Sequence, residues 1–120
     1  MPEMKMAGRG GRDGRAVGGL PILSSSDAQC GLVTVSSSSI ELKGAASRLD
    51  GRRRLLFQPT DGDIWVALIA DATAVKQSNT LKVTSGTIME VFFGDGEDDV
   101  AVNAIYDSAD VKVMCLEMKG

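Results

Sequence analysis

Residues 52–69 read RRRLLFQPTDGDIWVALI, and this stretch decides the fold class. Its apolar Leu-Leu-Phe run predicts a strand that Pro59 ends, because proline has no backbone N–H to donate to a neighbouring strand. The polar residues 60–63 predict a tight hairpin turn, since Asp and Gly tolerate the positive φ that such turns need. Residues 64–69 are apolar at every position, which predicts a central strand covered on both faces.

Short strands and turn signals continue on both sides of this stretch. They predict further strands over 31–35, 38–43, 80–84, 87–93, 100–106 and 111–118. We expect Leu81 and Val83 to face inward. Segment 71–77 is the best helix candidate and is too short to change the class. The pattern indicates an all-β fold, a small antiparallel β-sandwich or jelly-roll-like barrel with an extended N-terminal arm.

The composition excludes many kinds of chemistry. The chain has 120 residues, with 13 Lys and Arg, 16 Asp and Glu, and a net charge of −3. This length is typical of one small domain. The chain contains no His, which excludes Ser-His-Asp and Cys-His nucleophiles and every His-containing metal site.

Composition also divides the chain into three parts. Residues 1–19 hold four basic residues, two acidic residues and six glycines, and such a segment cannot offset its ordering entropy alone. We interpret them as an arm, residues 20–37 as a connecting segment with a short strand, and residues 38–120 as the β-sandwich domain.

The two cysteines are too far apart in sequence for a metal or redox motif. Cys30 and Cys115 match no Cys-x-x-Cys spacing, so we expect two reduced thiols, with Cys115 a small buried hydrophobe. No apolar stretch has the length of a signal peptide or a membrane span, and we expect a protein that is made in the cytoplasm and contacts no membrane.

Two charged clusters are candidate binding sites. The acidic loop 94–99 could hold a cation or a basic partner, although a solvated loop is commoner. Arg52 and Arg54 share one face of a strand and Arg53 the other, so at most two could contact phosphates together. The negative net charge argues against nucleic acid as a partner.

Catalysis finds little support in the sequence. Asp61 and Asp63 lie on a predicted hairpin tip, where nothing separates the pKa values of the two carboxyls. No Lys lies in a pattern that would make it a nucleophile. We therefore expect no enzyme and no cofactor.

Three segments resemble a family of small β-sandwich virion proteins of tailed bacteriophages, the capsid decoration (cement) or head-fibre proteins. The segments are RRRLLFQPTDGDIWVAL, LKVTSGTIMEV and VNAIYDSADVKVMCLE, within residues 52–117. The Gln-Pro step at Pro59 departs from the Gln-Asn of that group.

The resemblance implies a structural protein on the capsid exterior, assembled in the host cytoplasm, that braces the shell. Its partner would be the major capsid protein and its oligomer a homotrimer. On this hypothesis the arm binds the partner, with basic side chains on acidic groups and apolar ones in grooves. The candidate partner-binding residues are Met4, Lys5, Met6, Arg9, Arg12, Arg15, Val17, Leu20 and Ile22.

Other functions stay open at this point. A head-to-tail connector or tail protein could use the same kind of sandwich. A small carbohydrate-binding module would need exposed aromatic platforms, and Trp65 and Tyr106 are the plausible ones.

Overall fold

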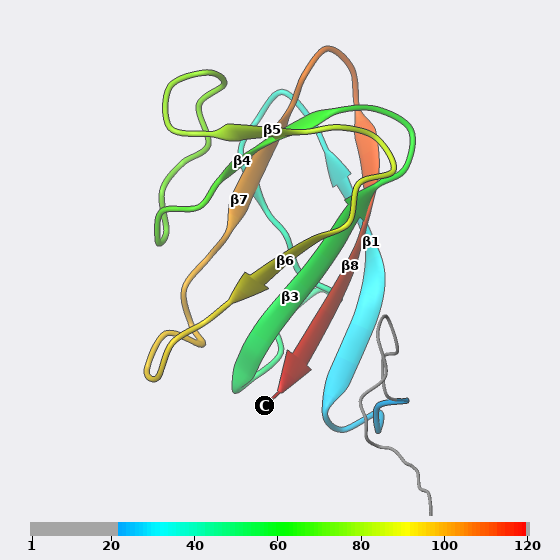
Figure 1. The fold of residues 1–120 in the computed structure, drawn as a ribbon, viewed down its shortest axis with the longest axis vertical. Coiled ribbons are helices and arrows are strands. Elements are labelled where there is room, and N and C mark those ends of the chain that lie inside the picture. The colour runs from blue at the N-terminus through cyan, green and yellow to red at the C-terminus, as the bar shows by residue number, and fades with distance from the viewer. Residues whose placement is uncertain (1–21, 120) are drawn as a thin grey trace, which may run out of the picture.

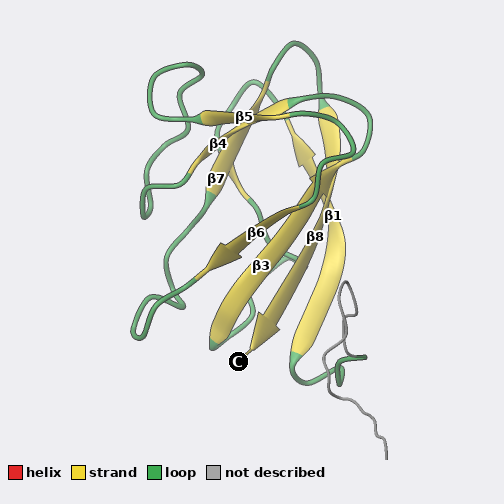
Figure 2. Ribbon diagram, in the orientation of Figure 1, coloured by secondary structure: helices red, strands yellow, loops and turns green. Residues whose placement is uncertain are grey.

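A computed structural model describes residues 22–119, which form two antiparallel sheets packed against each other (Figures 1 and 2). The strands are β1 (Ala28–Val35), β2 (Ile40–Glu41), β3 (Arg52–Pro59), β4 (Ile64–Ala67), β5 (Leu81–Val83), β6 (Met89–Phe92), β7 (Asn103–Tyr106) and β8 (Val111–Lys119). One sheet has the order β1-β8-β3-β6 and the other β2-β7-β4-β5. Residues 22–119 contain no helix, so none could span a membrane. The predicted all-β sandwich is confirmed.

Strand β8 is an inner strand of the first sheet and pairs on both sides. It pairs along its length with β1, from Ala28 opposite Met118 to Val35 opposite Val111, and on its other side with β3. Strand β1 lies in the segment that we interpreted as a connection. Its full register with β8 makes it part of the sheet.

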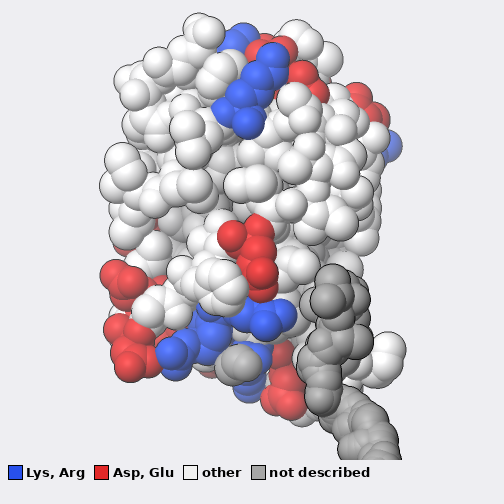
Figure 3. Space-filling model, viewed as in Figure 1, with Lys and Arg blue, Asp and Glu red and all other residues white. Residues whose placement is uncertain are grey.

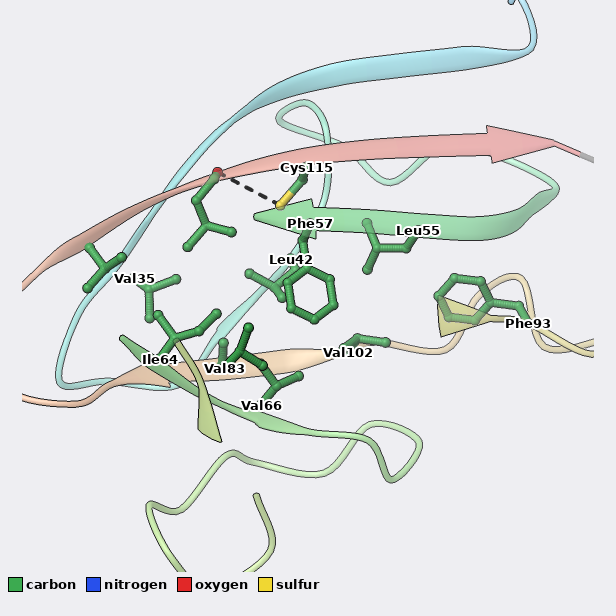
Figure 4. Packing of buried hydrophobic residues seen from close by; sticks show 13 residues of the cluster. Val35, Leu42, Leu55, Phe57, Ile64, Val66, Val83, Phe93, Val102 and Cys115 are labelled. Carbon is green, nitrogen blue, oxygen red and sulfur yellow. Dashed lines mark hydrogen bonds between the residues drawn. The ribbon is translucent and has the colours of Figure 1, made fainter. Parts of the chain in front are cut away.

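Thirteen buried residues fill the space between the sheets (Figure 4). The first sheet contributes Phe57 and Val113, among others, and the second contributes Ile64 and Val66. Their side chains alternate with outward-facing ones along most of the strands, as the pleat requires. Burying each large apolar side chain contributes about 1.5–3 kcal/mol to the hydrophobic term.

Two expectations about buried strands are wrong. Strand β4 ends at Ala67, because its partners β5 and β7 pair with it only over Ile64–Ala67, and residues 68–69 are exposed. Leu81 is exposed as well, because β5 is the edge of its sheet and pairs with a neighbour on one side only. Val83 is buried as expected.

Candidate functional site

The predicted partner-binding residues cannot be placed together. Met4, Lys5, Met6, Arg9, Arg12, Arg15, Val17 and Leu20 lie outside the described residues. Ile22 is described, and its side chain is fully exposed just before β1.

The arginine cluster differs from the expectation. The β3–β8 register shifts between Arg52 and Arg54, so Arg53 is an extra residue and the alternation of side chains breaks. Arg52 therefore points into the core and is fully buried, whereas Arg53 is exposed. A buried guanidinium cannot contact phosphates, so Arg52 belongs to the architecture of the protein.

Arg52 forms an ion-pair network between the sheets. Its Nη1 lies 2.7 Å from Oε2 of the buried Glu117, and its Nη2 lies 3.2 Å from Oε2 of Glu41 in the other sheet. Nη2 also donates to the carbonyl of Val100 at 2.6 Å, and the guanidinium stacks 4.4 Å from the ring centre of Phe93. These contacts pair both buried charges, which a stable interior requires.

Glu117 is held in its charged form. Burial alone would raise the pKa of its carboxyl, but hydrogen bonds from Gln29 (2.5 Å), the Gly44 N–H (2.7 Å) and Arg52 outweigh burial and lower that pKa below its ordinary value. The oxygens of the Glu117 carboxylate are thus occupied by hydrogen bonds from other residues of the same chain. The carboxylate therefore has a structural role and is not a free catalytic base.

The acidic side chains of loop 94–99 make contacts within the chain. Asp95 pairs with Arg53 at 2.7 Å, and Asp98 accepts a hydrogen bond from the Gly51 N–H at 3.1 Å. Within residues 22–119, no group of three or more His, Cys, Asp or Glu side chains could hold a metal ion. The contacts of this loop are those of a surface connection.

The aspartates of the turns are structural as well. Asp61 accepts a hydrogen bond from the Lys112 N–H, and Asp63 accepts one from the Ser85 N–H, at 2.8 and 2.9 Å. Asp107 accepts a hydrogen bond from Trp65 Nε1 at 2.9 Å, and this bond, with nearby lysines, lowers the pKa of its carboxyl. The indole of Trp65 is therefore tied to the protein by its polar edge.

The unexplained feature is the outer face of the first sheet, the side turned away from the core. We call this side of the first sheet the outer face. Its apolar residues are Leu32, Leu56, Ile88, Phe92, Met114 and Leu116. Leu32 is 56% exposed, Ile88 62% and Phe92 69%. In the view of Figure 3, uncharged atoms cover most of the surface between the two ends of the molecule.

Two adjoining grooves cross this face. One of about 190 Å³ is lined mainly by Leu56, Ile88, Met114 and Leu116. The other, of about 300 Å³, runs from Leu116 past Cys30 to Ile22, where the described chain begins. Because Leu116 lines both, the apolar surface continues across the sheet.

A sequence signal for this face exists. Residues 113–116 read Val-Met-Cys-Leu and residues 55–57 read Leu-Leu-Phe, so both sides of β3 and β8 are apolar. A sheet with one solvated side would alternate apolar and polar residues. Such runs alone do not say which side lacks a covering layer.

The fold is similar to that of known proteins, although the sequence is not. No family model and no curated protein matches the chain. A cupin superfamily protein from Desulfitobacterium hafniense has 10% identity and a TM-score of 0.50, with 84% of this chain and 75% of that chain covered. Protein NMB1881 from Neisseria meningitidis has 12% identity and a TM-score of 0.49, with 82% of each chain covered. A cupin-2 domain containing protein from Shewanella frigidimarina has 14% identity and a TM-score of 0.46, with 81% and 76% covered. At such low identity, the likeness shows the fold alone.

These comparisons correct the predicted function. The expectation of a phage capsid decoration protein, with a connector or tail protein as the alternative, is wrong, because the fold is similar to that of a cupin superfamily protein, which is not described as a virion protein. The segments that carried the resemblance are strand-and-turn patterns, which a small jelly-roll fold of another family also needs. The major capsid protein as partner, the homotrimer and the virion location stay untested predictions.

Proposed function

We propose that this protein is a non-catalytic binding module of cupin-like fold that packs its outer face against another protein. The single observation that carries the proposal is the exposure of Leu32, Ile88 and Phe92 on one sheet surface. Contiguous apolar patches of this kind mark interaction sites, because soluble proteins rarely leave them in water.

The charges of the outer face favour recognition by apolar packing. Arg54 Nε on β3 lies 3.0 Å from Glu90 Oε2 on the edge strand β6, so the two charges neutralise each other. This pair therefore leaves no net charge of its own to attract an acidic or a basic ligand. Shape and apolar area would then determine the affinity.

The interior supports a non-catalytic role. The side chains between the sheets are mainly apolar, and Arg52 and Glu117 there are hydrogen-bonded to the protein. The chain has no His, the side chain that most often serves as a general base near neutral pH.

Site-specific photo-crosslinking tests the proposal. A benzoylphenylalanine at Ile88 would report contacts of the outer face, and one at Val75, an exposed loop residue outside that face, is the control. In an extract of the source cells, we expect an adduct of discrete mass from position 88, absent from position 75. The adduct should disappear when Leu56→Glu is added to a chain that circular dichroism shows to be folded. Equal labelling from both positions would refute the proposal.

A further inference from the structure

We infer that the partner of the outer face is a second copy of this chain, packed face to face about a two-fold axis. The inference rests on the proposed function and names its partner. Three observations carry it: the size of the face, its charge and its symmetry of apolar residues.

The outer face has the size of a weak dimer interface. Strands β1, β3, β6 and β8 have eight, eight, four and nine residues, 29 in all. With about 3.3 Å per residue and about 4.8 Å between strands, they cover about 460 Å² per copy. Two such faces bury about 900 Å² together, a size typical of weak, reversible interfaces.

The charge distribution lets two copies meet on this face. The sequence from residue 22 on has nine basic and fourteen acidic residues, a net charge of −5, so two copies repel each other at long range. On the outer side of β3 and the edge strand β6, the charges of Arg54 and Glu90 neutralise each other. Two copies therefore approach there without like charges opposing each other.

The apolar residues are arranged for a self-complementary contact. Leu56 of β3 is the register partner of Leu116 in β8. Leu32 lies on the edge strand β1, and Ile88 directly precedes β6, the strand at the opposite edge of the same sheet. A two-fold axis that runs along the strands, between β3 and β8, places Leu56 of one copy over Leu116 of the other. The same axis places Leu32 of each copy over Ile88 of the other, as an isologous interface requires.

Sedimentation equilibrium of matched variants tests the inference. We expect the unaltered chain to sediment as a dimer and both Leu32→Glu and Ile88→Lys to sediment as monomers. Val75→Glu, an exposed site on another surface, should stay dimeric. Circular dichroism checks that each variant is folded.

The double variant Leu32→Glu/Ile88→Lys gives the sharpest readout. Within one chain these positions lie at opposite edges of the sheet, three strand spacings or about 14 Å apart, which is too far for an ion pair. Across the proposed axis they meet, so the double variant should recover the dimer that each single variant loses. Failure to recover would overturn the arrangement.

The remaining outcomes overturn the second copy as partner. A dimer that persists in both single variants would associate through another surface. A monomeric chain that still gives the adduct from position 88 would leave the proposed function standing with a different protein as partner. A chain that is monomeric in full and dimeric without residues 1–21 would show that its own N-terminal segment occupies the face.

Discussion

Arg52 has the largest fully buried side chain of the described residues. Its side chain is fully buried and pairs with the equally buried Glu117 and with Glu41. We expect Arg52→Ala to lower the free energy of unfolding by about 3–5 kcal/mol, because it leaves Glu117 buried without its charge partner. Urea unfolding measures the loss.

The neighbouring arginine is the matched control for this prediction. Arg53 pairs with Asp95 on the surface, where both side chains are exposed. Such pairs contribute about 0–1 kcal/mol, so Arg53→Ala should change stability little. Equal losses in the two variants would contradict a buried role for Arg52.

Glu117 should make stability depend on acidity. Its hydrogen bonds lower the pKa of the carboxyl in the folded protein, so its contribution is complete above the ordinary glutamate pKa of about 4.3. The contribution is lost as the pH falls through the lower, folded-state pKa. We expect chemical denaturation to show stability falling below about pH 4, and a smaller fall in Glu117→Gln. An identical pH profile for both proteins would show that Glu117 does not cause the effect.

At the scale of elements, a contact between β1 and the loop after β2 positions the Glu117 site. A Cβ on Gly44 would lie 2.5 Å from the carbonyl oxygen of Gln29, and one on Gly31 would lie 2.4 Å from that of Gly44. We expect Gly44→Ala to destabilise the protein by about 1–3 kcal/mol, because one backbone must shift. The shift would also lengthen the Gly44 N–H bond to Glu117. Thermal unfolding measures the change, with the exposed Ala45→Ser as control, and a Tm equal to that of the control would refute the contact.

Most strands could be predicted from local sequence, and the exceptions have physical causes. Pro59 and the polar turn after it ended β3 where expected, because both effects are local. The shift of register between Arg52 and Arg54 could not be predicted, since it depends on which partner β8 presents. The end of β4 at Ala67 likewise depends on the length of its partners.

At the scale of the whole molecule, the apolar outer face could not be predicted from the sequence. Apolar runs such as residues 113–116 say that both sides of a strand avoid water. They do not say that one side of the strand meets the second sheet and that, among residues 22–119, the other side meets no covering layer. Exposure of Leu32 and Ile88 depends on how the two sheets pair, which is a property of the complete fold.

The reactivity of Cys30 tests the central claim most directly, because this thiol lies on the outer side of the first sheet. Cys30 is exposed and lies opposite Leu116. Cys115 is buried, and burial together with the nearby Glu117 raises the pKa of the Cys115 thiol to about 12. The Cys115 thiol therefore stays unreactive in the folded chain. The measurement is the rate at which a thiol reagent labels the native protein in dilute and in concentrated solution. We expect the rate for Cys30 to fall severalfold as concentration rises, because a second copy covers the face. A rate that is the same at every concentration would contradict the claim.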